Sequence, residues 1–433
     1  MKYRLTILKF FTIFVFFVSL ALLYACQGND ETSDPIEKLI GMNQSENFHT
    51  NRLVDKETPY TLVFENNDST KSLYIFTSPI GYYDLSERLQ LIDTTLVSVT
   101  DLGMKKKGYS FETKSCDIVS YFPKRISKAP FLIQGKDSFL SFVPSDELAV
   151  ENLSKSTFTD LTGRRNSSAV YQKDGNIRLE YVSTTSGIMV NVNIEEKPEN
   201  NQLDFYIDKQ QEINYFINDN KYVVFKTIGN ESVTKAIIYT SFLQDSLGVC
   251  SFENTVKITP TEDQWKYSII LDESFLNDPD TQYPITISPT FELYRNKMPD
   301  SSVYSNKPST NVYLANYTVM GNNDFFGDSQ HYLRFGINYI FKSYAQNVKS
   351  AVYVSTAISR DLEPMSIEML RMKDNWISTA VNWDTKYPTY SKESTTQIST
   401  PGRYEFDITE FVKLSIQDDE WNTEVYGLAM TAV

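Results

Sequence analysis

Short runs of alternating apolar and polar residues dominate the chain from about residue 60 onward. This period of two is typical of half-buried strands, because successive side chains of a strand point to opposite faces of its sheet. Polar turns separate the runs, and few windows hold apolar residues at helical spacing. The pattern predicts strands at 61–64, 73–76, 89–92, 109–111, 118–122, 131–133 and 139–143. We therefore expect an all-β chain of antiparallel sandwiches, or an extended antiparallel meander.

The stretch from Trp265 to Thr290 is predicted to close one domain and lead into the next. Trp265, Tyr267 and Ile269 alternate with polar residues, and a second alternating run reaches Ile287. The Asn-Asp-Pro-Asp sequence between the two runs favours a turn, since Asn and Asp bond their own backbone and Pro presets φ. The pattern indicates a hairpin-like element that ends a β-rich region.

Domain boundaries follow from this element and from the polar segments. The β-rich region is predicted to span 59–290, and the polar segment 146–168 divides it into two sub-domains if it is a long loop. A separate module is expected at 291–433, with strands predicted at 300–304, 311–314, 331–335, 348–354, 366–370, 403–408 and 424–430. Seven or eight strands in about 140 residues is the size of a jelly roll.

The first 25 residues have the pattern of a lipoprotein signal peptide. Lys2 and Arg4 precede a long apolar run, and the sequence Leu-Tyr-Ala-Cys, which ends at Cys26, fits a bacterial lipobox. Cleavage before Cys26 and lipidation of its thiol are predicted, although an uncleaved membrane anchor is the alternative. The polar segment 26–58 is predicted to be a flexible tether. Both alternatives place the body outside the cytoplasm, held at a cell membrane or outer membrane.

Net charge limits the possible partners. The formal net charge is −14, and removal of the signal peptide lowers it by three because Lys2, Arg4 and Lys9 are lost. Such acidity argues against nucleic acid and anionic lipid surfaces as partners and favours the binding of divalent cations. Beyond Cys26, the chain has Cys116 and Cys250. They are predicted to form one disulfide or to remain two buried thiols.

Catalytic chemistry has little support in the sequence. The chain holds two histidines, and because His49 lies in the tether, a Ser-His-Asp or Cys-His site would have to use His331. No Cys/His cluster has zinc spacing and no glycine-rich phosphate loop is present. Acidic residues such as Glu180 are interpreted as solvated surface. A polysaccharide lyase or glycosidase would need two positioned carboxylates, which no recognisable spacing supplies.

Motifs in the β-rich region and the module follow the order seen in a family of surface proteins. The motifs are TSPIGYYDLSERLQLIDTTL (77–96), AVYQKDGNIRLEYVSTTSGIMVNVNI (169–194), FLQDSLG (242–248) and LDESFLNDPDTQYPITISPT (271–290). In this order they resemble the region that precedes DNRLRE domains in bacterial wall-associated and RHS-repeat surface proteins. Ser288 replaces the usual Asp of that family, so no carboxylate role is carried over there.

The module itself resembles a DNRLRE domain. The matching elements are Asp300, Arg334-Phe335, Val348-Lys-Ser-Ala351, Trp376 to Trp383, Phe406-Asp-Ile-Thr409 and Tyr426-Gly-Leu428. Ser378 stands where a Glu is usual, and Gly336-Ile337 stand for Asp-Leu. Such domains resemble the carbohydrate-binding modules of polysaccharide-acting surface proteins, so the resemblance implies a β-sandwich that binds glycan.

Two sets of residues in the module are candidates for ligands. Trp376, Trp383 and Tyr387 are candidates to stack on a sugar, and the alternative is that the two tryptophans pack in the core. Candidates for a structural Ca²⁺ are Asp300, Asp384 and Asp407, because Ca²⁺ prefers oxygen ligands. Asp407 is equally suited to bond a turn amide.

The function predicted from these observations is adhesion or display. We expect a lipid-anchored cell-surface protein without catalytic activity, whose last module binds polysaccharide or cell-wall glycan. The alternatives are a structural stalk of an RHS-like assembly and, with less support, a polysaccharide-degrading enzyme.

Overall fold

The computed structural model describes residues 49–433, apart from residues 146–147, 149–151, 160–164, 173–176, 219–220, 230–231, 296–297, 299, 314, 316, 336–346, 359–363, 373 and 418–425. Every described residue belongs to one compact unit, Ser45–Val433. The predicted signal peptide and Cys26 lie outside the described residues. None of the helices in the described part is both long and apolar enough to cross a membrane.

A small antiparallel sheet begins the described chain, with the strand order β1-β2-β3. Its elements are β1 (His49–Arg52), the 3-10 helix η1 (Val54–Lys56), β2 (Thr61–Asn66) and β3 (Lys71–Ile75). The Arg52 guanidinium donates two hydrogen bonds, of 2.8 and 2.7 Å, to the carboxylate of Glu57, whose side chain is fully buried. Paired bonds of this kind fix geometry as well as charge. Residues 49–58, predicted to belong to a flexible tether, thus carry a strand and a 3-10 helix.

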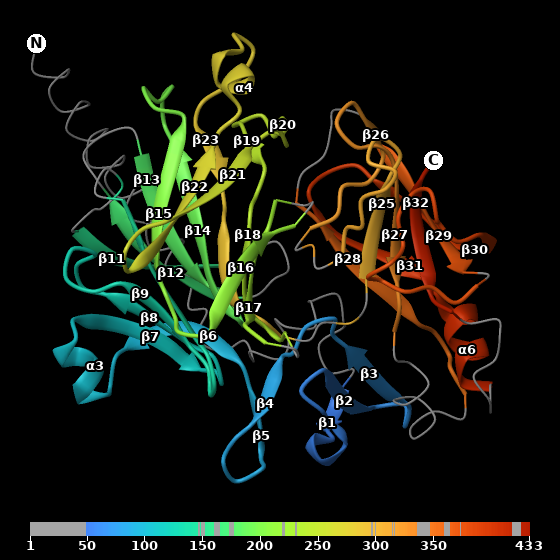
Figure 1. Ribbon diagram of the computed structural model, residues 1–433. Helices are drawn as coiled ribbons and strands as arrows, with labels where there is room; N and C mark the ends of the chain where they lie inside the picture. Colours follow the sequence, from blue (N-terminus) through green and yellow to red (C-terminus); the bar gives the residue numbers. More distant parts are fainter. Residues whose placement is uncertain are drawn as a thin grey trace, which may run out of the picture. The chain divides into compact units, whose positions relative to one another are not determined.

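The first large layer is an eight-stranded antiparallel sheet in the order β21-β22-β15-β10-β9-β8-β7-β6 (Figure 1). Its strands are β6 (Asp93–Ser98), β7 (Tyr109–Ser115), β8 (Val119–Pro123), β9 (Phe131–Gln134), β10 (Phe139–Pro144), β15 (Gln202–Asp208), β21 (Thr255–Pro260) and β22 (Gln264–Ile270). The hairpin of β4 (Gly81–Tyr83) and β5 (Leu89–Leu91) precedes it, and the helix α3 (Leu102–Lys106) joins β6 to β7. Asp101 caps α3 by accepting a hydrogen bond from the Met104 amide.

The second layer is an eleven-stranded antiparallel sheet with the main order β11-β12-β13-β14-β24-β18-β17-β16. These strands are β11 (Asn152–Thr159), β12 (Arg165–Gln172), β13 (Ile177–Ser183), β14 (Gly187–Ile194), β16 (Ile213–Ile217), β17 (Val223–Thr227), β18 (Thr234–Tyr239) and β24 (Thr290–Leu293). The short strands β19 (Leu243–Gln244), β20 (Cys250–Ser251) and β23 (Ile285–Ile287) pair at its side. The helix α4 (Glu273–Asn277) follows β22.

One hydrophobic core lies between these two sheets. Phe131 of β9 and Phe142 of β10 stack on rings of the other sheet, with centroid separations of 4.0 Å to Tyr181 and 3.9 Å to Phe291. All four rings are fully buried or nearly so. Aromatic pairs contribute beyond the area that they bury, so these contacts join the layers into a single sandwich.

The position of the returning strands corrects two predicted boundaries. Strands β15, β21 and β22 come after residue 168 and yet complete the first sheet beside β10, so the region is not divided near 146–168. Strand β24 pairs with β14 and β18 in the middle of the second sheet. A boundary at residue 290 therefore cuts through this strand, and the sandwich extends to Leu293.

The C-terminal region contains a six-stranded antiparallel sheet with the main order β25-β27-β32-β29-β30, to which β26 adds by pairing with β27. Its elements are β25 (Asp300–Tyr304), β26 (Asn322–Asn323), β27 (Gly327–Leu333), β29 (Met365–Met372), β30 (Thr389–Ile398) and β32 (Leu428–Ala432). A two-stranded sheet of β28 (Val352–Ala357) and β31 (Gly402–Asp407) and the helix α6 (Thr409–Gln417) complete the region. This is the all-β architecture that the sequence predicts, here with β26, β30 and α6 in addition. Where a strand is predicted at 311–314, Val312 forms an isolated bridge with Ser302.

Alternate residues of the six-stranded sheet enter two different hydrophobic clusters. On β32, Leu428 and Met430 pack in one cluster and Ala429 in the other, as expected for side chains that alternate between faces. The first cluster also contains Phe406, Ile408, Phe411 and Val412, from β31 and the start of α6. The second contains Val303, Tyr332, Met372, Trp376 and Val381. The segment between β29 and β30 therefore covers one face of this sheet.

Candidate functional site

Trp376, on the segment that joins β29 to β30, is a core residue. Its side chain is 1% exposed, and its Nε1 donates a hydrogen bond of 3.1 Å to the Tyr426 carbonyl. The Tyr332 ring lies 5.4 Å away, and the Arg334 guanidinium lies 5.5 Å from the Trp376 ring. No ring face is left open to a sugar, so the structure removes Trp376 from the predicted stacking residues. Its indole instead anchors the segment that carries the other two.

Trp383 and Tyr387 are half-buried and pack against the cluster that contains Trp376. The Lys386 ammonium lies 3.6 Å from the Trp383 ring centroid, a favourable cation–π distance. The turn that carries Trp383 is closed by hydrogen bonds between Asn382 and Thr385. Part of each ring is thus buried against the protein and part is exposed. The hydrogen bonds between Asn382 and Thr385 hold the turn that carries Trp383.

The turn is also tied to the neighbouring segment before β26. The Asn311 amide donates to the carbonyls of Ser378 and Val381 at 2.8 and 2.6 Å, and the Asp384 amide donates to the Pro308 carbonyl at 3.1 Å. These bonds hold the Trp383 turn in one backbone conformation. A binding ring that is already positioned loses less conformational entropy when a ligand binds.

The three predicted Ca²⁺ ligands do not assemble into a site. Across the described residues, no group of three or more His, Cys, Asp or Glu side chains is placed to hold a metal ion. Asp300 lies on β25, whereas exposed Asp384 lies on the Trp383 turn. The Asp407 carboxylate accepts a hydrogen bond of 2.9 Å from the Thr409 amide, and bonds to Thr409 lower the pKa of Asp407. Asp407 therefore bonds a turn amide, as the alternative interpretation has it.

His331 lies on β27, and its side chain is buried within the C-terminal region. Its ring is 8% exposed, and Nδ1 lies 3.0 Å from the Ser302 hydroxyl and 3.1 Å from the Thr318 hydroxyl. Burial lowers the pKa of His331 to about 4, so the ring is neutral at physiological pH. Both contacts are with hydroxyls in the packed interior, and the ring does not face an open site.

Cys116 and Cys250 do not form a disulfide with each other in the structure, so the predicted disulfide is wrong. Of the two thiols predicted to be buried, Cys116 is buried and Cys250 is half-buried. Cys116 is buried in the core of the sandwich, and burial raises the pKa of its thiol to about 11. A thiol with such a pKa is a poor nucleophile at neutral pH, because the thiolate is the reactive form.

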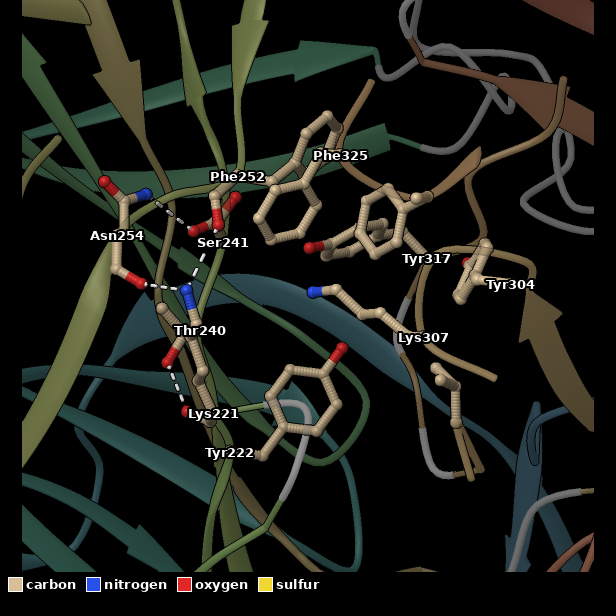
Figure 2. Close-up of a pocket in the computed structure, with 12 residues that line it drawn as sticks. Lys221, Tyr222, Thr240, Ser241, Phe252, Asn254, Tyr304, Lys307, Tyr317 and Phe325 are labelled. Atoms are coloured by element: carbon tan, nitrogen blue, oxygen red, sulfur yellow. Dashed lines mark hydrogen bonds between the residues drawn. The ribbon is translucent and has the colours of Figure 1, made fainter. Parts of the chain in front are cut away.

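Sequence reasoning missed a pocket that is lined by residues from two distant parts of the chain. Lys221, Thr240 and Asn254 come from the ends of strands β17, β18 and β21, whereas Tyr304, Lys307 and Phe325 come from β25 and the turns that follow it. Figure 2 shows the Lys307 side chain reaching across the pocket toward the segment that carries Lys221. The cavity has a volume of about 50 Å³.

The two lysines occupy different surroundings in this pocket. The Lys221 ammonium donates to the carbonyls of Asn254 at 2.5 Å and Phe252 at 3.3 Å. The Lys307 ammonium lies over two aromatic rings, 3.6 Å from the Phe325 centroid and 4.9 Å from the Phe326 centroid. Burial lowers the pKa of both lysines, that of Lys307 to about 8, and the positive charge of Lys221 adds to the effect on Lys307.

Residues 292–427 match the model of carbohydrate-binding module family 96. No curated protein matches the chain. The match begins within β24, covers β25 to β31, Trp383, Tyr387 and the Lys307 side of the pocket, and ends just before β32. It supports carbohydrate binding by the C-terminal region, on a β-sandwich fold.

Proposed function

We propose that this protein is a non-catalytic, lipid-anchored surface protein that binds glycan through its C-terminal region. The observation that carries the proposal is the match of residues 292–427 to a family of carbohydrate-binding modules. A binding module needs positioned contact groups rather than an acid and a base, and the Trp383 turn offers such groups. The predicted kinship with DNRLRE-containing, RHS-type surface proteins is part of this proposal and rests on the ordered motifs of the sequence.

Trp383 and Tyr387 are the proposed contacts for the apolar face of a sugar. Both rings are half-buried, which combines a fixed orientation with an accessible part. The Lys386 ammonium lies over one face of the Trp383 ring, and we expect this exposed side chain to move aside when a sugar stacks there. Lys386 and the exposed neighbour Asp384 then supply polar partners for sugar hydroxyls. An amphipathic ring with polar neighbours is the combination that sugar recognition requires.

Binding is tested with the full chain, because β24 joins the C-terminal region to the sandwich. The protein is titrated calorimetrically with a panel of soluble oligosaccharides from plant, algal and bacterial walls. We expect saturable binding to at least one of them, and an affinity about tenfold lower in Trp383→Ala, which corresponds to about 1.4 kcal/mol.

Phe216→Ala is the matched control for Trp383→Ala. Phe216 is an exposed ring, 40% accessible, with the Lys226 ammonium 4.8 Å from its centroid, and it lies on β16 of the sandwich. Its replacement is expected to leave the affinity unchanged. Equal losses in both variants, or no binding to any oligosaccharide by the folded wild-type protein, would contradict the proposal and favour a structural stalk.

The lipid anchor is tested separately. Metabolic labelling with a radioactive fatty acid is expected to label the wild-type protein in a bacterial host and to leave Cys26→Ser unlabelled. The same variant is expected to keep its signal peptide, because the lipobox peptidase requires the modified cysteine. Labelling of Cys26→Ser would show that the predicted lipobox is not used.

A further inference from the structure

The ammonium group of Lys307 is the starting point of a second inference. Lys307 is half-buried, and within the described part of the chain its Nζ has neither a hydrogen-bond acceptor nor an ion-pair partner. Its neighbours are the rings of Phe325 and Phe326, which attract a cation but accept no strong hydrogen bond. Lysine carries three donors, and a buried charge is costly when its donors are unused.

A second cation makes the arrangement less favourable still. Lys221 lines the same cavity, and its charge disfavours the charged form of Lys307. Exposed Glu253 attracts both ammonium groups, and Asp272 attracts that of Lys221, but neither carboxylate forms an ion pair with these lysines in the described structure. Neither ammonium group thus has an ion-pair partner among the described residues.

The polar lining groups besides the two lysines are neutral, and several carry hydrogen-bond donors. Burial raises the pKa of Tyr222 and Tyr317, so both phenols keep their protons at physiological pH. Ser241 adds a hydroxyl to the lining. A cavity of about 50 Å³ exceeds the ~10–15 Å³ that one water requires, so it admits a small polyatomic group. The apolar walls formed by Phe252 and Phe325 would strengthen electrostatic contacts within it.

We propose that this cavity binds an oxyanion, a carboxylate, sulfate or phosphate group, with Lys307 as the principal contact and Lys221 as the second cation. The oxygen atoms of such a group would satisfy the unused donors of Lys307 and place a negative charge between two positive ones. The chain as a whole is acidic, so this recognition is local and not the result of long-range attraction. No residue of the Trp383 turn lines this cavity, and we expect anion binding in it not to depend on sugar binding at the turn.

The test measures binding of sodium sulfate and sodium phosphate to the full chain by calorimetry, at constant ionic strength set with chloride. We expect saturable binding of one anion per chain, at least tenfold weaker in Lys307→Met, which keeps the aliphatic stem against Phe325. Affinity is expected to fall as the pH rises through about 8, because Lys307 then loses its charge. Lys307→Gln provides a second variant, and circular dichroism verifies that both variants are folded.

Lys226→Met is the matched control, since Lys226 is also half-buried and lies over an aromatic ring but does not line the cavity. It is expected to bind the anions as the wild type does. Unchanged affinity in folded Lys307→Met and Lys307→Gln would overturn the proposal, as would a lack of saturable binding by the wild type.

A third titration identifies the source of the anion. Glucuronate differs from glucose by one carboxylate, so glucose is the uncharged control. Stronger binding of glucuronate than of either glucose or sulfate, lost in Lys307→Met, would assign the cavity to an acidic sugar. Stronger binding of phosphate or sulfate would assign it to a free or esterified anion. Trp383→Ala is expected to leave all of these affinities unchanged, so failure of the oxyanion site and failure of the proposed sugar site are distinguishable.

Discussion

The two β-rich regions of the chain bury their apolar residues differently. In the sandwich that ends at Leu293, both large sheets contribute to one continuous core, with Phe142 and Phe291 stacked between them. In the C-terminal region, the six-stranded sheet packs against separate clusters on its two faces. One face is covered by β31 and α6, and the other by the segment that contains Trp376. On one face of the C-terminal sheet, a loop therefore covers the apolar side chains that a second sheet covers in the sandwich.

This difference explains where the candidate sites lie. A loop that covers a sheet places some rings inside and leaves the next ones at the surface, as Trp376 and Trp383 do seven residues apart. In the sandwich, by contrast, the two large sheets pack directly against each other, and no such loop lies between them. Residues at the strand ends of the sandwich, among them Lys221 and Asn254, instead line the cavity opposite Lys307.

The largest expected effect tests the continuous core of the sandwich. Phe291→Ala removes a fully buried ring that stacks on Phe142 and also contacts Phe205, so we expect a loss of about 3–5 kcal/mol in the free energy of unfolding. Urea denaturation followed by tryptophan fluorescence measures it. Phe139→Ala, on a ring that is 44% exposed, is the control and is expected to change stability by about 0.5 kcal/mol or less. Similar losses in both variants would refute the assigned core.

Acid is expected to weaken the C-terminal region before the sandwich. The pKa of His331 is about 4 in the folded state and about 6.5 in an unfolded chain, so the unfolded state binds more protons between these values. Stability therefore falls as the pH falls from about 6.5 to about 4, by on the order of 3 kcal/mol.

Hydrogen exchange of amides in β25 and β27, compared with those in β9 and β10, measures the effect of acid on the two regions. His331→Gln removes the titrating ring and is expected to flatten the pH dependence of the C-terminal strands in this window. An unchanged pH dependence in that variant would show that other groups cause the acid sensitivity.

The smallest expected effect concerns the exposed turn at the start of α6. Asp407→Ala removes the acceptor for the Thr409 amide, and we expect a loss of about 1 kcal/mol or less. Thermal unfolding is measured with millimolar Ca²⁺ and with a chelator, and the loss is expected to be the same in both. A stabilisation by Ca²⁺ that disappears in Asp407→Ala would restore Asp407 as a metal ligand.

The sequence determined the class of the fold and many strand positions, but it predicted no strand between residues 144 and 264, where the structure has β11 to β21. Alternation of apolar and polar residues located β7 and β29, as expected for strands with one buried face. Short apolar runs bounded by polar turns located β2, β9 and β10. The sequence pattern did not locate α6, whose apolar residues fall within a short stretch next to a predicted strand, or β30, whose run of Thr, Ser, Lys and Gln has few apolar positions.

Only the tertiary structure decided how the strands divide between sheets and which polar groups meet. Local patterning holds no information on partners far apart in the chain, so the sequence could not show that β24 lies in the middle of a sheet. For the same reason it could not distinguish buried Trp376 from half-exposed Trp383, which have similar local surroundings. Lys221 and Lys307 lie 86 positions apart in the sequence, and the fold alone brings their charges to one cavity.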